Sequence, residues 1–428
     1  MKEKRLRVLL CVVCAAWLLC ACTGGGQAGA PASASPVPSA CAAPVKLEPL
    51  QGAGGTVYGA AGPEGFYSIA GIARPDGSLN IQYTDYASLQ TVFLCAQPNC
   101  AHDSESCTSF LPGGGGVSLM MVNGQLVLVS PSGSTENERP QLPCVCVCEP
   151  DGSARREVVS FAANQQLVGP YITDGTGLYA TLETTEKARV ATELIYIDLQ
   201  AGKFSSVLSL DHTKSETVVS AEGEYMILYA RNGYDPNDMN GDYSVCYQRV
   251  NINTLEREQI FEYAAGEGLP GVFGRNFLFY SRPKNEIEQI DCLTGERRVL
   301  AREVLPAGGS MLELSLCFYD QGRLLYAVPS GEETDNSERT FFVTGADPDS
   351  KTEFRLTYLD MERPLPVEPI AQIEGEDSYF VIADRVLLPR EDHREDGTSF
   401  TAYIPVPVYG KIRCEDFWAG SGAIERAE

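Results

Sequence analysis

A strand-and-turn unit that recurs along most of the chain limits the folds open to this sequence more than any other feature. Short runs rich in Val, Ile, Leu, Phe and Tyr alternate with Gly, Asp, Asn, Ser and Pro, and no segment after residue 50 shows a long helical apolar period. Asp, Asn or Gly stand where a tight hairpin turn needs them. The turn centres lie near residues 87, 151, 200, 253, 294 and 361, so successive turns are 64, 49, 53, 41 and 67 residues apart.

Units of this length, each with three or four strands, are typical of β-propeller blades. The segment "SFTAYIPVPVYGKIRCEDF" (399–417) predicts a last strand pair, which would complete a seventh unit. We therefore predict an all-β chain in which residues 51–428 form one β-propeller domain of about seven blades. A pair of β-sandwiches or an irregular all-β solenoid is the alternative. A propeller explains the near-regular spacing better and leaves no exposed sheet edge.

The first residues predict an exported protein that is anchored by lipid. Basic residues between Lys2 and Arg7 precede an apolar run that ends at Ala21, which is too short to span a bilayer comfortably and is typical of a signal peptide. "LCAC" (Leu19–Cys22) matches a bacterial lipobox, so we expect residues 1–21 to be removed and Cys22 to carry lipid. An ordinary signal peptide followed by an incidental cysteine is the alternative. Residues 22–50 are dominated by Gly, Ala, Ser and Pro and predict a disordered tether with a reach of about 30 Å.

The chain is strongly acidic, with a formal net charge of −24. Removal of residues 1–21 takes away four basic residues and one acidic residue, which leaves 29 − 56 = −27. Phosphate contacts need Lys and Arg, so this charge excludes nucleic acid as an expected partner. It also argues against docking flat on an anionic membrane leaflet. We expect a monomer on the extracytoplasmic face of the cell membrane, held there by lipid, with a protein or carbohydrate ligand.

The cysteines include one cluster with the chemistry of a metal site. Of fifteen cysteines, three lie in the predicted signal peptide and one would carry lipid, and the remaining eleven cannot all pair internally. Zinc takes four N or S donors, and the segment "CAQPNCAHDSESC" supplies a full set in Cys95, Cys100, His102 and Cys107. The spacing C-x4-C-x-H-x4-C matches zinc by chemistry and not by a familiar motif.

Two other interpretations of this Cys/His box stay open. Outside the membrane, exposed thiols oxidise unless a metal protects them, so a disulfide between two of the three cysteines is the main alternative to one structural zinc. A redox pair is the weaker alternative, because the C-x-x-C spacing is absent. The box follows the turn near residue 87, and we expect it to connect the first and second blades and to tie that connection down.

A second group of cysteines lies in "CVCVC". If this segment is a strand, Cys144, Cys146 and Cys148 line one face and Val145 and Val147 the other. Cysteines two apart in a strand are near or beyond the separation that a disulfide spans, so they should not bridge each other. We expect a strand face filled by small side chains.

Long polar loops are expected on one face of the propeller, where ligand binding is commonly found. In one of them, Asp238, Asn240 and Asp242 alternate as oxygen ligands do in a calcium loop. The glycine falls one position early and no bidentate Glu follows, so a polar hairpin is the simpler interpretation. The loops span residues 131–143, 231–243, 330–340 and 390–399.

The sequence carries no familiar catalytic motif. It has no G-x-S-x-G elbow, H-E-x-x-H helix or glycine-rich phosphate loop, and one of its three histidines belongs to the Cys/His box. We therefore expect a non-catalytic binding or interaction module that uses the face with the long loops. The alternative is an extracytoplasmic propeller enzyme, a glycan lyase or hydrolase, with converging carboxylates or an Arg–Tyr cluster. A regulatory component that contacts a neighbouring protein through the same face has the same sequence signature as the binding module.

Four segments together carry a family resemblance: the lipobox at Leu19–Cys22, "YTDYASLQTVFLC" (83–95), the Cys/His box that follows it, and the ending "YGKIRCEDFWAG" (409–420). With them, the chain resembles propeller-like lipoproteins of Gram-positive (Firmicutes-type) bacteria. The resemblance spans most of the chain. It implies a propeller fold and a lipid-anchored location, and it implies no particular activity.

Overall fold

The structure is a computed structural model. It describes residues 45–50, 59–74, 76–112, 116–133, 141–187, 189–235, 238, 241–307, 309–329, 339–360, 363–393 and 398–426. Strands predominate, and the α-helix found across these residues, α1 (Cys414–Trp418), has five residues. None of the helices in this part of the chain is long and apolar enough to cross a membrane.

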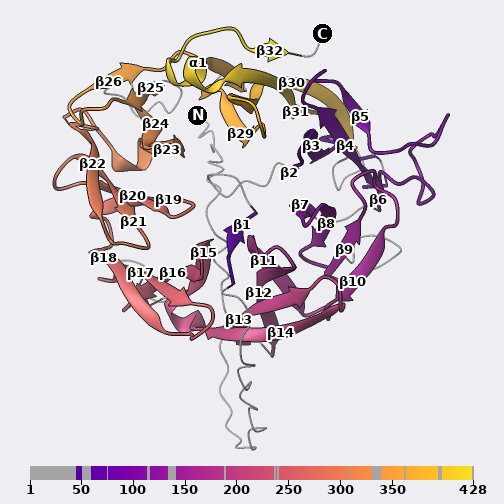
Figure 1. The fold of residues 1–428 in the computed structure, drawn as a ribbon, viewed down its shortest axis with the longest axis horizontal. Coiled ribbons are helices and arrows are strands. Elements are labelled where there is room, and N and C mark those ends of the chain that lie inside the picture. Colours follow the sequence, from indigo (N-terminus) through magenta and orange to yellow (C-terminus); the bar gives the residue numbers. More distant parts are fainter. Residues whose placement is uncertain are drawn as a thin grey trace, which may run out of the picture. The chain divides into compact units, whose positions relative to one another are not determined.

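Within the described residues, the strands form seven antiparallel sheets of four or five strands that surround a common centre (Figure 1). This arrangement confirms the predicted all-β propeller, with seven blades. Each blade is one contiguous stretch of chain, and its strands follow one another outward from the centre. Three shorter elements lie outside the regular blade pattern: β1 (Glu48–Pro49) and the hairpin of β27 (Thr357–Asp360) and β28 (Arg363–Pro366).

The first four blades occupy residues 59–264. Blade 1 consists of β2 (Gly59–Ala61), β3 (Gly65–Ile69), β4 (Leu79–Asp85), β5 (Thr91–Phe93) and β6 (Phe110–Leu111). Blade 2 consists of β7 (Ser118–Val122), β8 (Gln125–Ser130), β9 (Cys144–Cys148) and β10 (Arg156–Ser160). Blade 3 consists of β11 (Gln165–Thr173), β12 (Gly177–Glu186), β13 (Arg189–Asp198) and β14 (Lys203–Leu210). Blade 4 consists of β15 (Thr217–Glu222), β16 (Tyr225–Asn232), β17 (Ser244–Asn251) and β18 (Arg257–Ala264).

The last three blades occupy residues 268–426. Blade 5 consists of β19 (Gly268–Phe273), β20 (Asn276–Ser281), β21 (Glu286–Asp291) and β22 (Arg297–Arg302). Blade 6 consists of β23 (Ser315–Asp320), β24 (Arg323–Pro329), β25 (Arg339–Thr344) and β26 (Lys351–Glu353). Blade 7 consists of β29 (Glu368–Gln372), β30 (Ser378–His393), β31 (Ser399–Arg413) and β32 (Glu425–Arg426).

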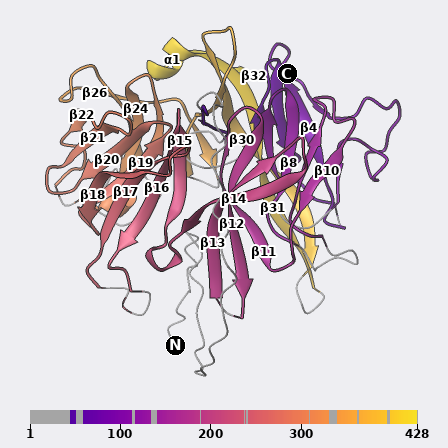
Figure 2. The same cartoon turned by 60° about the horizontal axis from the view of Figure 1, so that its bottom comes forward.

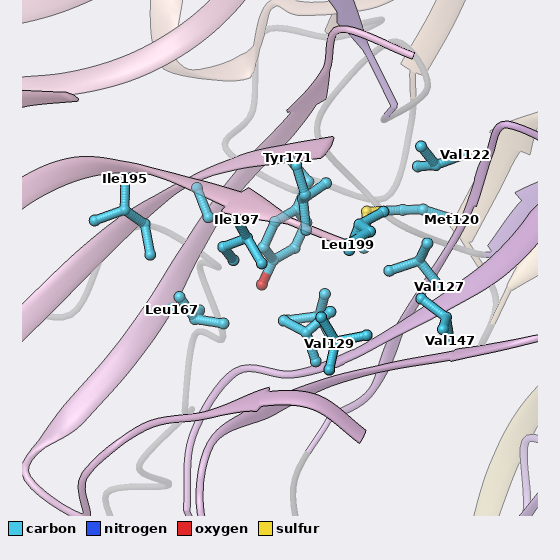
Figure 3. Close-up of a cluster of buried hydrophobic side chains, with 14 of the residues drawn as sticks. Met120, Val122, Val127, Val129, Val147, Leu167, Tyr171, Ile195, Ile197 and Leu199 are labelled. Carbon is cyan, nitrogen blue, oxygen red and sulfur yellow. The ribbon is translucent and has the colours of Figure 1, made fainter. Parts of the chain in front are cut away.

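Apolar side chains fill the interfaces between neighbouring blades. Among the described residues, seven buried clusters are present, one for each pair of adjacent blades. In β8, for example, Leu126 and Leu128 pack toward blade 1, whereas Val127 and Val129 pack toward blade 3 (Figure 3). Because both faces of such strands are buried, the strands appear in the sequence as continuous apolar runs without strict alternation.

The ring closes between blades 7 and 1 by side-chain packing. No strand is exchanged between these two blades in the described part of the chain. The ring of Phe380 from blade 7 lies 5.4 Å from that of Phe66 and 5.1 Å from that of Tyr86, both from blade 1. Tyr409 stacks on Phe380 with a centroid distance of 5.1 Å. Tilted and edge-on aromatic pairs of this kind add stabilisation beyond the area that they bury.

Residues 45–50, at the end of the predicted tether, are part of the propeller. β1 pairs with the inner edge of β11, on the side of the ring's centre (Figure 1). The backbone N–H of Leu47 donates to the Gly223 carbonyl of blade 4, and Leu47 is 1% exposed in the cluster between blades 3 and 4. This segment therefore joins two blades from the inside.

Two details of the predicted strand pattern are wrong. The turn near residue 361 joins β27 and β28, an extra hairpin before blade 7, whereas the outer turn of blade 6 spans residues 345–350 between β25 and β26. Residues 399–417 form one long strand followed by α1, not a strand pair. β31 stays continuous because β30 pairs with it from Ser378 to His393.

The four predicted long loops each join the second and third strands of a blade, namely β8 to β9, β16 to β17, β24 to β25 and β30 to β31. Antiparallel order places these connections at the same end of the sheets, which we call the loop face. The distal parts of β30 and β31 extend toward the loop face, and α1 lies at the opposite end of blade 7 (Figure 2). The prediction that the long loops share one face is thus consistent with the topology of their flanking strands.

Candidate metal centre

The Cys/His box is an excursion from the outer strand of blade 1. β5 pairs with β4 through Thr91–Phe93, and β6 continues along the same edge of β4 with Phe110 opposite Asn80. Between them, Ile81 accepts a hydrogen bond from the Leu94 N–H at 3.0 Å and donates to the Ser109 carbonyl at 2.8 Å. β5 and β6 are therefore two parts of one strand, and residues 95–108 leave it and return (Figure 1).

This placement corrects the expected position of the box. It does not connect blade 1 to blade 2, because the chain rejoins blade 1 after the box. Burial explains the return: Leu94 before the excursion and Leu111 after it are 7% and 5% exposed, and both pack in the cluster between blades 1 and 2. The polar residues between them contribute little to that cluster and lie outside it.

The four predicted donors come together. The donor atoms of Cys95, Cys100, His102 and Cys107 all lie within 4.8 Å of one another. Zn–S bonds of about 2.3 Å in a tetrahedron place neighbouring donors about 3.5–4 Å apart, so a small contraction brings this group to zinc geometry. Cys107 is buried and the other three residues are partly buried. The donor set and its spacing therefore fit a tetrahedral metal ion.

Backbone conformation and two side chains from the neighbouring β3–β4 loop and β4 hold His102 in place. Asn99 and His102 adopt positive φ angles of 56° and 58°, which fold the excursion back on itself. The His102 carbonyl accepts hydrogen bonds from Arg74 at 2.6 Å and from Asn80 at 3.0 Å. The other end of His102 is fixed by its ring, whose Nδ1 lies 3.3 Å from the Cys107 Sγ.

Contacts within blade 1 and from blade 2 hold together the two ends of the excursion, where the chain leaves and rejoins the strand. The Thr108 hydroxyl donates to the Leu94 carbonyl at 2.8 Å, which joins the outgoing and returning chains. Arg155 of blade 2 donates to the carbonyls of Thr108 and Phe110. The Ser109 hydroxyl lies 3.1 Å from the Cys107 Sγ. Such contacts orient the donor residues, as outer-shell partners do in known metal sites.

The thiols of the box are free and unequal. All cysteines that the structure describes are unpaired, including the three of the box. Burial alone would raise the pKa of Cys95, but hydrogen bonds from the Gln97 backbone and from the other two thiols hold its pKa below the usual value. The same thiol contacts, together with burial, raise the pKa of Cys100 despite the His102 backbone N–H, which lowers it.

The "CVCVC" segment forms β9 as predicted. Val145 and Val147 pack in the cluster toward blade 3, whereas Cys146 and Cys148 pack toward blade 1. The Cys146 thiol donates to Cys144 and lowers the pKa of Cys144 to about 7, and that hydrogen bond and burial raise the pKa of Cys146. None of these three belongs to the metal-ligand group, so they fill a strand face as expected.

The predicted calcium loop gains no support from the residues that can be placed. Asn240 lies outside the described residues, as does the predicted lipid-bearing Cys22. Asp238 and Asp242 are described, and they do not join a third described Asp, Glu, His or Cys in a ligand group. The Gly241 N–H donates to the Asp238 carbonyl at 3.0 Å, which is a turn contact.

The residues that position the box were not foreseen from the sequence. Arg74, Asn80 and Arg155 reach it from segments distant in the chain, and no local motif surrounds them. Asn80 is 3% exposed, but its strand also carries Gln82 and Thr84, so the sequence does not mark it as the buried polar residue. A buried polar residue needs a hydrogen-bond partner, but the sequence does not say which residue that partner is.

Comparison with known proteins yields structural neighbours only. No family model and no curated protein sequence matches the chain. Similar solved structures include the β-propeller domain of the Trilobed protease from Pyrococcus furiosus, with 8% identity, a TM-score of 0.46, and coverage of 86% of this chain and 94% of that one. An oligogalacturonate lyase in complex with manganese has 11% identity, a TM-score of 0.41, and coverage of 84% and 90%. A second such lyase, from Vibrio parahaemolyticus, has 12% identity, a TM-score of 0.42, and coverage of 85% and 92%.

Proposed function

We propose that the chain is an extracytoplasmic, lipid-anchored binding module of the Firmicutes type, in which a rigid propeller presents its loop face to a protein or carbohydrate ligand. The anchor is the lipid expected on Cys22, and no catalytic step is required. The observation that carries the proposal is a two-stranded ribbon of blade 7, formed by residues 385–393 of β30 and 399–407 of β31.

The ribbon exposes apolar side chains beyond the body of the blade. β29 pairs with β30 only as far as Ile382, and β32 pairs only with Gly410 and Lys411 of β31. Three consecutive residues of the ribbon are exposed, Val386 at 45%, Leu387 at 45% and Leu388 at 39%. On the other strand, Tyr403 lies opposite Pro389 and is 61% exposed. Consecutive exposed apolar residues are unfavourable in water and are usual at contact surfaces.

Prolines in the ribbon limit the ways in which a partner could bind it. Pro405 and Pro407 lie in β31 and Pro389 lies in β30. Proline has no N–H to donate, so it obstructs the addition of a further strand along the edge. A ligand would therefore contact the side-chain faces of the ribbon, where Tyr403 and Leu387 lie.

Site-specific photo-crosslinking tests this function. The full chain is made in its native host with p-benzoylphenylalanine in place of Tyr403 or Leu387, and cross-linked products are separated by mass. We expect discrete adducts from both positions. The controls carry the same group in place of Leu312, in the 3-10 turn before blade 6, or Leu255, in the outer turn of blade 4, which are 89% and 41% exposed. The same adducts from the control positions, or none from the ribbon, would refute a contact surface at the ribbon.

An Arg–Tyr cluster favours a second candidate, a glycan lyase or hydrolase. The guanidinium of Arg231, at the loop end of β16, lies 5.0 Å from the ring centroid of Tyr234 and 6.0 Å from that of Tyr243. Its Nε donates to the Tyr229 hydroxyl at 2.7 Å. If this cluster is catalytic, the chain will release products from an acidic polysaccharide and Tyr243→Phe will abolish the release. Release that is unchanged in that variant would exclude the cluster as the active site.

We also propose that the Cys/His box holds one structural zinc. Three thiolates and one imidazole fill all four positions of a tetrahedral ion, so no position remains for a substrate or water. Zinc there would lock the excursion and shield its thiols from oxidation. The expected role is therefore a clasp on the outside of blade 1.

Metal analysis of the full chain, purified without oxygen, checks this prediction. We expect one zinc per chain and, after chelation, recovery of all three box thiols. Cys100→Ser should lower zinc content at least tenfold, whereas Cys246→Ser, which changes a buried cysteine of blade 4, should leave it unchanged. A chain without metal and with two thiols missing from the box would establish the disulfide instead.

A further inference from the structure

The segment that carries β1 shows at which face the chain enters the propeller. The first and second strands of each blade are joined at the end of the sheets opposite the loop face, and we call this end the turn face. The backbone N–H of Leu47 donates to the carbonyl of Gly223, which lies in the turn between β15 and β16. Glu48 pairs with Thr173, the last residue of β11. Leu47 and Glu48 therefore lie at the turn face.

From the turn face the chain runs into the ring. Pro49 pairs with Ile172, one residue earlier in β11, and the Leu50 N–H donates to the Tyr171 carbonyl. Because β11 runs from the loop face to the turn face, an antiparallel neighbour enters at the turn face and runs toward the loop face. β1 lies on the side of the ring's centre (Figure 1). Val45, to which the expected tether is attached, therefore lies at the turn face and close to the centre.

The expected tether is too short to pass easily around a blade. Twenty-two residues separate Cys22 from Val45, and a flexible coil of that length has a mean reach of about 25 Å. Five strands lie side by side from β1 to β14, so the rim of blade 3 is about 19 Å from β1. β12 runs from the turn face to the loop face and, with ten residues, is about 30 Å long. A lipid on Cys22 would thus need a path of about 50 Å to lie beside the loop face.

An apolar ribbon on a lipid-anchored protein could lie in the bilayer or against a partner. Leucine and tyrosine side chains are among those that enter a membrane interface, and Leu387 and Tyr403 are exposed. Residues 385–393 extend the ribbon by about 30 Å toward the loop face, away from the turn face (Figure 2). Insertion of the ribbon into the bilayer that holds Cys22 would therefore stretch the tether to more than twice its mean reach.

We propose that the lipid on Cys22 holds the turn face toward the membrane, and that the loop face and its ribbon point outward. This inference rests on the lipid anchor and the ribbon contact of the proposed function. It adds the place of the partner, because the ribbon then meets a component outside the membrane and not the bilayer. The entry of the chain near the centre of the turn face sets the orientation, since a body held at one point turns that point toward its anchor.

Energy transfer from single positions to the bilayer measures this orientation. The lipidated full chain carries a fluorescent amino acid at one position and is bound to phosphatidylcholine vesicles that contain one-tenth phosphatidylglycerol and an acceptor-labelled lipid. Leu255 and Thr294, in the outer turns of blades 4 and 5, are the turn-face positions. Glu186, at the end of β12, and Tyr403 of the ribbon are the loop-face positions. All four are exposed, and we expect at least twofold higher transfer from the turn-face positions.

Two variants test the cause of the orientation. Insertion of forty Gly and Ser residues after Ala30 lengthens the mean reach of the tether to about 45 Å, and we expect the difference in transfer to disappear. Leu387→Asp, a change at an exposed position of the ribbon, should leave all four transfers unchanged. A difference that persists in the chain with the long tether would overturn the proposal, because another contact would then set the orientation.

The outcomes separate the orientation from the anchor. Equal transfer from all four positions of vesicle-bound chains would overturn the orientation and leave the anchor intact. The highest transfer from Tyr403, together with its loss in Leu387→Asp, would overturn the proposal by placing the ribbon in the bilayer. Cys22→Ser should not float with the vesicles. If the unaltered chain also fails to float with them, the anchor is wrong and the proposal falls with it.

Discussion

Asp291 holds the outer turn of blade 5 by three contacts. Its Oδ1 accepts the backbone N–H groups of Leu293 and Thr294 at 2.8 and 2.9 Å, and Arg275 forms an ion pair with its Oδ2. Burial alone would raise the pKa of Asp291, but the hydrogen bonds from Arg275 and from the two N–H groups hold its pKa below the usual value of 3.8. The ionised form is therefore the one that the fold stabilises.

This depressed pKa predicts a specific dependence of stability on pH. Because the pKa of Asp291 is lower in the folded chain than in the unfolded chain, its contribution is complete above about pH 5 and declines as the pH falls through 4 and below. Asp291→Asn should lower the free energy of unfolding by about 1–2 kcal/mol at pH 7, and by progressively less toward pH 3. Urea unfolding at several pH values measures the difference. Asp349→Asn, at a carboxylate 64% exposed, is the control and should change little at any pH.

At the residue scale, the four members of the candidate metal group were predictable because their chemistry is local. Cys95, Cys100, His102 and Cys107 fall within thirteen positions, so their residue types alone define a ligand set. Asp291 was predictable only as a turn residue. Its partner Arg275 lies on another strand connection, and pairing across a sheet depends on a register that the sequence pattern does not fix.

At the element scale, the outer turns of most blades share one construction. An Asp or Asn at the end of the third strand accepts backbone N–H groups from the turn, as Asp198, Asn251 and Asp291 do. Four residues later the chain adopts a positive φ, which is 66° at Gly202 and 60° at Leu255. These turns could be located because the acceptor residue is visible in the sequence. The extra β27–β28 hairpin was mistaken for an outer turn because β27 also ends in an Asp, Asp360.

Leu255 provides a test of this turn construction. A leucine at φ 60° is strained relative to glycine, and its side chain is 41% exposed, so little burial would be lost on replacement. Leu255→Gly should therefore raise the free energy of unfolding by up to about 1 kcal/mol, even though glycine makes the unfolded chain more flexible. Thermal unfolding of the two chains measures the change. Leu312→Gly, at an exposed leucine of a 3-10 turn outside the outer turns, should be neutral or destabilising, and an equal gain there would contradict the explanation.

At the scale of the whole molecule, the ring depends on interfaces between blades more than on any shared strand. Each blade is formed by one contiguous stretch of chain. The seven apolar clusters and the aromatic packing of Phe66 and Phe380 connect these blades. The number of blades could be predicted because each blade repeats the same strand order. The inner pairing of β1 could not, because the alternating residues 45–48 are few, are followed at once by Pro49 and come after a stretch of Gly, Ala, Ser and Pro.

Leu47, directly before β1, is the residue through which this segment stabilises the ring. It is fully buried between blades 3 and 4, so Leu47→Ala should lower the free energy of unfolding by about 2–4 kcal/mol. Hydrogen exchange should become faster in β11 and β15, the inner strands on either side of it. Lys46→Ala changes the exposed neighbour and serves as the control. Unchanged exchange in both inner strands would mean that β1 does not join the blades.

The way the Cys/His box leaves and rejoins its strand has a consequence for how such a centre arises. Before the box, Thr91 lies opposite Thr84, so the numbers of paired residues add up to 175. After the box, Leu111 lies opposite Leu79, and the numbers add up to 190. The two registers therefore differ by 190 − 175 = 15 residues. Residues 95–109 are fifteen residues, and excising them would bring Phe110 directly after Leu94 and still opposite Asn80. The centre is thus a self-contained insertion into a finished blade. A single insertion or deletion event can add or remove it without disturbing the ladder, and the outer strand of any other blade offers a comparable point of insertion.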